Sequence, residues 1–223
     1  MTDFALARRN MVESQIRTND VTDHRLISAF LEVPRERFVP PAMRELAYID
    51  EDITVKEGDS AAARRWLMEP MPFARMVQLA DISETDLILD VGCATGYSTA
   101  ILARLAESVV GLESDEDLAE RAENQLVDLG VGNAAVVTGE LAQGYASQGP
   151  YDVIILEGSV EEIPAELFSQ LRDGGRLVAA VANGPIGKAT LYRSVGGDIS
   201  SRIAFDVNVE RLPGFQKAPA FVF

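Results

Sequence analysis

The stretch LILDVGCATGYS, residues 87–98, decides the fold because it joins a buried apolar run to a glycine-containing turn and then to a helix start. Backbone N–H groups at the start of a helix, with the positive end of the helix dipole, favour an acidic or polar ligand. Gly92 and Gly96 allow the backbone to approach such a ligand closely. A plain strand-to-helix turn has the same pattern, so the loop alone leaves both interpretations open.

The spacing of the loop differs from that of nicotinamide and flavin sites, which require G-x-G-x-x-G. Ala94 and Tyr97 stand at the second and third glycine positions of that pattern, so it fails twice. The form D-x-G-x-x-x-G instead resembles motif I of the class I S-adenosylmethionine-dependent methyltransferases, with Ala94 in place of a third glycine. This resemblance implies that the following residues contact the cofactor: Asp90, Gly92, Cys93, Ala94, Gly96 and Tyr97.

Short runs rich in β-branched residues alternate with amphipathic segments after about residue 72. The expected strands are 87–91, 108–113, 134–138, 151–157 and 176–182. Apolar residues recur every three or four positions in 115–129 and 161–171, which predicts a helix in each. Ser114 with Asp117 resembles a capping box, and Gly130 is a helix-ending residue. This alternation predicts a parallel sheet covered on both faces.

Acidic residues follow several of the expected strands. Glu113 ends the second strand, 21 residues after Gly92 (113 − 92), where an acid can bind the hydroxyls of a ribose. A solvated carboxylate is the alternative. Ser114 adjoins Glu113 and is expected in the same site. Methyltransferases also often place an acid after the third strand, against the adenine amino group. The expected contacts after the third and fourth strands are Gly139, Glu140, Leu141 and Glu157.

Composition narrows the classes of partner. The 223 residues include 20 basic and 35 acidic side chains, which gives a net charge of −15 and makes nucleic acid a poor partner. No apolar run reaches the length of a membrane span, and the first residues lack the pattern of a secretory signal. The single cysteine, Cys93, excludes an internal disulfide and gives no metal-site spacing. We expect a soluble cytoplasmic protein without a metal, its oligomeric state open and a monomer slightly favoured.

Longer stretches resemble the protein-L-isoaspartate (D-aspartate) O-methyltransferase family. The similar segments are MVESQIRTNDVTDHRLISAFLEVPRERFVPPAMRELAYID (11–50), ILDVGCATGYSTAILARL (88–105), VVGLE (109–113) and YDVIILEGSVEEIPAELFSQLRDGGRLVAAV (151–181). The stretch VPRERFVP together with AYID is more specific than any glycine loop. The resemblance covers roughly residues 10–182. It implies methyl transfer from S-adenosylmethionine to the abnormal α-carboxylate of isoaspartyl residues in damaged proteins.

The family also implies the fold class: α/β, Rossmann-like, with a doubly wound, seven-stranded, mostly parallel sheet. We expect one domain over residues 1–223. Residues 1–71 would form an N-terminal helical cap and an acceptor loop, and residues 72–187 the cofactor-binding core. Residues 188–223 would supply edge strands, including an antiparallel hairpin.

The chain departs from the family in ARRWLMEP, residues 63–70. The family carries Gly-Gln-Thr-Ile-Ser-Gln-Pro there, so Trp66 takes the threonine position and Met68 the serine position. Both hydroxyls that help to place the acceptor carboxylate are missing. Arg64 or Arg65 could bind a carboxylate bidentately, and Trp66 could meet the sulfonium cation. Alternatively, both arginines are solvated and the Trp-Leu-Met run packs into the domain.

The loss of hydroxyls need not abolish the reaction. An acceptor carboxylate with a pKa near ~4 is already ionised at neutral pH, so no general base is required. We therefore expect an isoaspartyl methyltransferase in which Trp66, Leu67 and Met68 narrow the acceptor mouth. The alternatives are a methyltransferase for another acceptor and a catalytically impaired cofactor-binding protein. His24 is expected at the surface or as a cap, and Cys93 as a small filler.

Overall fold

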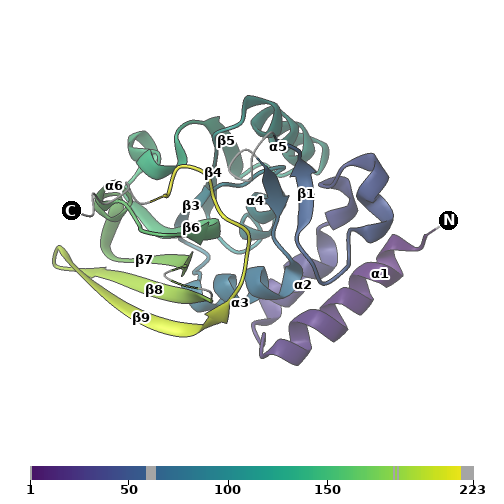
Figure 1. Cartoon of the computed structure of the whole chain (residues 1–223), viewed down its shortest axis with the longest axis horizontal. Coiled ribbons are helices and arrows are strands. Elements are labelled where there is room, and N and C mark those ends of the chain that lie inside the picture. The colour runs from purple at the N-terminus through teal and green to yellow at the C-terminus, as the bar shows by residue number, and fades with distance from the viewer. Residues whose placement is uncertain (1, 59–63, 183, 185, 217–223) are drawn as a thin grey trace, which may run out of the picture.

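The computed structural model of the chain describes residues 2–58, 64–182, 184 and 186–216. A seven-stranded sheet in the order β5-β4-β3-β6-β7-β8-β9 forms its centre (Figure 1). Its strands are β3 (Leu87–Val91), β4 (Ser108–Glu113), β5 (Ala134–Thr138), β6 (Tyr151–Val160), β7 (Leu171–Val181), β8 (Gly187–Val195) and β9 (Asp198–Val207). Strands β3 to β7 pair in parallel, whereas β8 is antiparallel to both neighbours. The predicted mostly parallel sheet with an antiparallel edge hairpin is therefore confirmed.

Helices cover both faces of this sheet (Figure 1). The α-helices are α1 (Phe4–Met11), α2 (His24–Glu32), α3 (Pro70–Ala80), α4 (Tyr97–Leu102), α5 (Glu116–Asp128) and α6 (Ala165–Ser169). A π-helical turn, Val12–Ile16, and 3₁₀ turns complete the set: Arg17–Asn19, Arg35–Arg37, Pro41–Leu46, Leu141–Gln143 and Ala146–Gln148. Helix α2 and the π-helical turn pack against α3, and α1 packs against both of them; these N-terminal helices are called the cap below. No helix in the described part of the chain is long and apolar enough to cross a membrane.

Alternate strand residues enter two separate apolar clusters. Ile88 and Val153 belong to a cluster that includes the cap, α3 and α5. Their neighbours Leu89 and Ile154 belong to a second cluster, on the other face, with α6 and Leu212. This period of two, with both faces apolar, is typical of a parallel sheet buried on both sides. It fixes which side chains of each strand meet the helices and leaves the carboxyl ends of the strands for the site.

The expected start of the helix at 115–129 is wrong by one residue. Asp115, not Ser114, is the N-cap, because its side chain accepts a hydrogen bond from the N–H of Leu118 at 3.1 Å. The hydroxyl of Ser114 lies instead 3.3 Å from Oε1 of Glu113, to which it donates. The helical stripe itself is confirmed, since Leu118, Ala122 and Leu126 are all buried.

The expected helix over 161–171 is mostly wrong. Only Ala165–Ser169 is helical, with Pro164 at its N-cap. The carbonyl of Gln170 accepts a hydrogen bond from the N–H of Tyr151 at 2.8 Å, which draws the chain into the sheet. Leu171 therefore opens β7 rather than closing a helix. Pairing with a neighbouring strand has overridden the local apolar period.

The family's acceptor segment lies in a small second sheet. Strands β1 (Ile53–Lys56) and β2 (Arg65–Leu67) pair antiparallel, with Thr54 opposite Trp66. Residues 57 and 58 follow β1 without regular secondary structure, and residues 59–63 lie outside the described residues. Because alternate residues of β2 face opposite sides, Arg65 and Leu67 are buried while Trp66 is half-buried. Sequence patterns did not predict this short strand.

Candidate active site

The glycine loop between β3 and α4 has the backbone form that a nucleotide site needs. Gly92 and Gly96 have φ values of +85° and +89°, and Ala94 has +49°. A side chain at Gly96 would reach 3.0 Å from the Cβ of Ala122, so the glycine lets α5 pack closely. A left-handed alanine costs roughly 1–2 kcal/mol relative to the right-handed form. The surrounding contacts therefore hold the loop in a conformation that is locally unfavourable.

Glu113 at the end of β4 binds the loop directly. Its Oε2 accepts a hydrogen bond from the N–H of Ala94 at 2.8 Å. Its Oε1 accepts from the N–H groups of Ser114 and Asp115 at 2.8 and 3.1 Å. The carboxylate is 0% exposed. The acid predicted to bind a ribose thus lies beside the glycine loop, as the spacing implied, but it is covered.

Arg65 covers it. Its Nη2 donates to Oε2 of Glu113 at 2.7 Å and to the carbonyl of Gly92 at 3.1 Å. Arg65 is 4% exposed, so the ion pair is buried. Arg65 was predicted to bind an acceptor carboxylate, but here it binds a carboxylate of its own chain. Arg64 is exposed and lies 3.5 Å from Glu57, as the solvated alternative expects.

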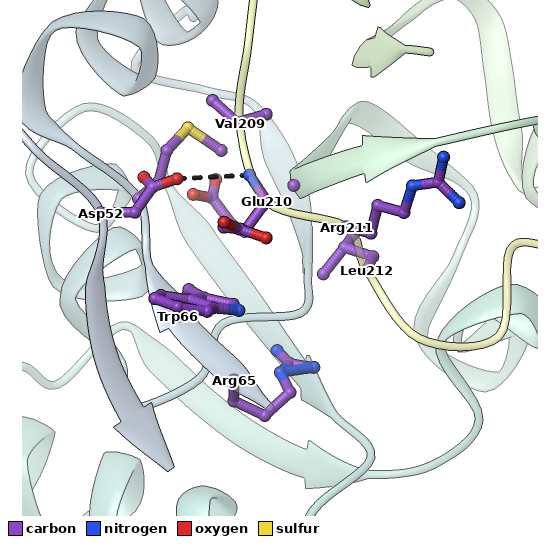
Figure 2. A pocket seen from close by; sticks show the side chains of 10 residues that line it. Asp52, Arg65, Trp66, Val209, Glu210, Arg211 and Leu212 are labelled. Atoms are coloured by element: carbon purple, nitrogen blue, oxygen red, sulfur yellow. Dashed lines mark hydrogen bonds between the residues drawn. The ribbon is translucent and has the colours of Figure 1, made fainter. Parts of the chain in front are cut away.

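A cavity of about 10 Å³ remains at the carboxyl edge of the sheet, roughly the room of one water molecule. It is lined by Asp52, Arg65, Trp66, Met68, Glu157, Gly158, Val209, Glu210, Arg211 and Leu212 (Figure 2). Trp66 and Met68, the two residues matched to the family's hydroxyl positions, therefore both line this cavity. Leu67, which was expected to narrow the acceptor mouth with them, does not line this cavity and is buried in the core cluster with the cap.

Two further carboxyl groups lie under the site. Asp90 accepts hydrogen bonds from the hydroxyls of Ser98 at 2.8 Å and Thr99 at 2.6 Å, which anchors the start of α4 to β3. Burial raises the pKa of Asp90, and the charge of Glu113 adds to the rise. Burial also raises the pKa of Glu157 well above its usual value, with a further contribution from Asp90. Such shifts are typical of functional sites, and both groups lie where the sheet presents its ligands.

The other predicted cofactor contacts are distributed more widely. The ring of Tyr97 is buried among Phe30, Phe38 and Phe73 of the cap and α3, so its side chain points away from the cavity. Cys93 is buried beside Gly111, as a small filler would be, and burial raises the pKa of its thiol.

The segment after β5 lies beside the end of β4. The N–H of Gly139 donates to the carbonyl of Glu113 at 2.9 Å. Leu141 belongs to the second apolar cluster. Glu140 is exposed. No group of three or more potential metal-binding side chains occurs among the described residues.

Sequence reasoning missed the contribution of the segment after β9. The N–H of Leu212 donates to the carbonyl of Ser159 at 2.9 Å, and the N–H of Ser159 donates to the carbonyl of Glu210 at 2.8 Å. Asp52 accepts a hydrogen bond from the N–H of Glu210 at 3.2 Å (Figure 2). It also accepts one from the N–H of Glu69, the N-cap of α3, at 2.7 Å, and so joins this segment to the start of α3. No local pattern marks residues 208–216, which match the family less well, as a part of the site.

The fold and the glycine loop with its acid define a Rossmann-like methyltransferase of class I. The family described as protein-L-isoaspartate(D-aspartate) O-methyltransferase (PCMT) matches residues 7–207. The chain belongs to this family of enzymes, whose methyl donor is S-adenosylmethionine.

Individual relatives agree with this assignment. A protein-L-isoaspartate O-methyltransferase of Koribacter versatilis is 35% identical over 197 residues, which cover 88% of this chain and 86% of the relative. One from Methanoculleus marisnigri is 38% identical over 174 residues, covering 78% and 76%. Among solved structures, a protein-L-isoaspartate O-methyltransferase superposes with a TM-score of 0.80 at 24% identity. That match covers 93% of this chain but 66% of the other, which is longer.

A second solved structure, a beta-aspartate methyltransferase (PCMT) from Plasmodium falciparum in complex with S-adenosyl-L-homocysteine, has a TM-score of 0.76 at 19% identity. The match covers 98% of this chain and 100% of the other. At these identities the two structures establish the fold.

The cofactor fits the backbone of the site but not its side chains as described. Ligands of such sheets bind outside the carboxyl ends of the strands, where the strand order reverses, which here is between β3 and β6. A Cβ placed on Gly92 would lie 2.6 Å from Leu212 and 3.4 Å from Nη2 of Arg65. These two side chains therefore take the space above the glycine loop, and the cavity that they line, of about 10 Å³, is too small for a nucleoside.

Proposed function

We propose that the chain transfers a methyl group from S-adenosylmethionine to the carboxylate of isoaspartyl residues in proteins or peptides. The observation that carries this proposal is the contact between Glu113 and Ala94, which joins the acid at the end of β4 to the loop between β3 and α4. An acid in this position binds ribose hydroxyls in nucleotide-binding sheets. Membership of the isoaspartyl methyltransferase family supports the choice of acceptor.

The chain's own residues need supply only position. An acceptor carboxylate is ionised near neutral pH, so its oxygen can attack a methyl group without losing a proton first. Holding the two reactants in line is the main contribution that a protein makes to such a transfer. Trp66 and Met68 line the cavity but offer no hydroxyl to an acceptor. This difference favours slow transfer, or another acceptor, as the second candidate function.

A direct assay separates these candidates. The purified chain is incubated with labelled S-adenosylmethionine and with an isoaspartyl peptide, and label in the methyl ester is measured. The aspartyl peptide of the same sequence is the control. We expect transfer to the isoaspartyl peptide alone. Label on neither peptide, at saturating cofactor, contradicts the proposed acceptor.

The surface charge supports proteins rather than nucleic acids as partners. With 35 acidic and 20 basic residues, the chain offers few cations to neutralise phosphates. The single cysteine is buried and unpaired, as is common in a reducing compartment, and we extend the proposal to a cytoplasmic location. A complex with duplex DNA at physiological salt in a gel-shift experiment would contradict the preference for proteins over nucleic acids.

A further inference from the structure

Leu212 fills the crevice at which a parallel sheet of this kind binds its ligand. Its Cδ2 lies 2.6 Å from the position that a Cβ on Gly92 would take, and its Cγ lies 2.8 Å from that of Gly158. Gly92 follows β3, and Gly158 lies within β6. These are the two strands on either side of the reversal in strand order. The leucine is 4% exposed. It therefore occupies the topological switch point itself.

Arg65 blocks access of a ribose to Glu113, the second contact that a nucleoside ligand needs. It approaches the same glycine loop and holds Oε2 of Glu113 at 2.7 Å. Three backbone N–H groups and the hydroxyl of Ser114 also donate to that carboxylate. A ribose can reach Glu113 only if Arg65 leaves it. Figure 2 shows that the two blocking side chains come from different segments, Arg65 from β2 and Leu212 from the chain after β9.

The cradle beneath these side chains is intact. Gly92, Ala94 and Gly96 keep positive φ values, and Ala94 keeps its hydrogen bond to Glu113. A loop that had lost its ligand-binding role would gain by relaxing the left-handed alanine, since that conformation is unfavourable without support. The blocking side chains thus cover a formed site and have not replaced it.

The closed arrangement leaves buried polar atoms unmatched. Nη1 of Arg65 and Oε1 of Glu157, both lining residues of the cavity, have no hydrogen-bond partner among the described residues. Buried polar atoms are normally paired, and an unpaired one is destabilising. The segment that carries Leu212 is held at this end by two backbone hydrogen bonds with Ser159, one to Asp52, and an exposed ion pair between Arg211 and Glu161 at 2.9 Å. These features favour an arrangement that opens.

We propose that Leu212 and Arg65 form a gate over the cofactor cleft, and that S-adenosylmethionine or its demethylated product binds only when both side chains withdraw. This inference rests on the proposed function, since it takes Glu113 and the glycine loop as the cofactor site. Opening moves Leu212 out of the crevice and exchanges the guanidinium on Glu113 for ribose hydroxyls. The measured association constant then equals that of the open form multiplied by the fraction of molecules that are open.

Calorimetry with S-adenosylhomocysteine tests the gate through Leu212→Ala. The substitution empties the crevice, so we expect binding about tenfold tighter than in the unchanged chain. Leu171→Ala is the matched control, because Leu171 lies in the same apolar cluster but does not line the cavity. Leu171→Ala should leave the affinity for S-adenosylhomocysteine unchanged and lower the thermal midpoint about as much as Leu212→Ala does. Equal affinity of the unchanged chain and Leu212→Ala overturns the gate and leaves the proposed function standing. Absence of binding in every variant overturns the cofactor assignment itself.

Hydrogen exchange on the unchanged chain gives a second measurement that does not depend on a variant. The N–H of Leu212 is bonded to Ser159 in the closed form. Saturating S-adenosylhomocysteine should speed exchange of this amide, while the amides of β3 and β4 exchange more slowly. Slower exchange at Leu212 on binding overturns the gate, because the segment then closes on the ligand instead of leaving it.

Discussion

Arg65 and Glu113 form a buried ion pair in which the two partners are unequally supported. The carboxylate also accepts three backbone hydrogen bonds, whereas the guanidinium has, besides Glu113, the carbonyl of Gly92. A buried charge that loses its partner is destabilising, and the loss is greater when nothing else satisfies the charge. Loss of Glu113 should therefore destabilise the protein more than loss of Arg65.

We expect this asymmetry in the free energy of unfolding. Glu113→Gln leaves Arg65 with little compensation and should destabilise the chain by about 3–5 kcal/mol. Arg65→Met leaves the carboxylate with its three backbone donors and should cost less than half as much. Urea denaturation measures both. Equal losses, or a larger loss for Arg65→Met, would show that the backbone donors do not sustain the buried carboxylate.

Arg35 is predicted to position the acceptor segment from within the cap. It is fully buried, its Nε donates to the carbonyl of Ala47 and its Nη2 to that of Met68, both at 2.8 Å. Lysine cannot span both carbonyls, so Arg35→Lys should lower the free energy of unfolding by about 2–3 kcal/mol. Arg37→Lys, on the same short turn but exposed in part, is the control and should change it little. Unfolding of both variants at the same urea concentration contradicts the prediction.

Glu69 gives the chain a predicted pH dependence. Burial raises its pKa to about 7, and the charge of Asp52 adds to the rise. The folded form holds this proton more tightly than the unfolded form, whose glutamate has a pKa of about 4.3. Stability from this group is therefore fully present below the lower value and is lost as pH rises through about 7.

Glu69→Gln removes the titrating group, so its thermal midpoint should fall less between those two pH values than that of the unchanged chain. Glu120→Gln, at an exposed position of α5, removes the same charge elsewhere. It should keep the original slope. An unchanged slope in Glu69→Gln would show that other carboxyl groups cause the dependence.

The sheet could be predicted from sequence because its signals are local. Each strand of the core carries a short β-branched run, and the acid at Glu113 follows from its distance to the glycine loop. The gate could not be predicted in this way. Leu212 and Gly92 are far apart in sequence, and nothing around Leu212 distinguishes it from an ordinary core residue. Arg65 was expected to meet a carboxylate, but only packing could show that the carboxylate is Glu113.

The last prediction concerns the two positions where the family carries hydroxyls. Trp66 and Met68 both line the cavity, and Met68 is 6% exposed, so apolar bulk stands where the family presents threonine and serine. Trp66→Thr with Met68→Ser should raise transfer to isoaspartyl peptides, because a hydrogen bond to a charged acceptor contributes about 1.5–3 kcal/mol and so roughly tenfold or more in kcat/KM.

Initial rates at saturating S-adenosylmethionine measure this effect separately from cofactor binding. The control pair, Trp66→Ala with Met68→Ala, removes the bulk without adding hydroxyls. If positioning is what the chain lacks, the alanine pair stays near the rate of the unchanged chain and the hydroxyl pair exceeds it. Equal gains in both pairs would assign the effect to space alone. A loss of activity in the hydroxyl pair would mean that Trp66 and Met68 themselves hold the acceptor, which would then be sought among ligands with an apolar surface.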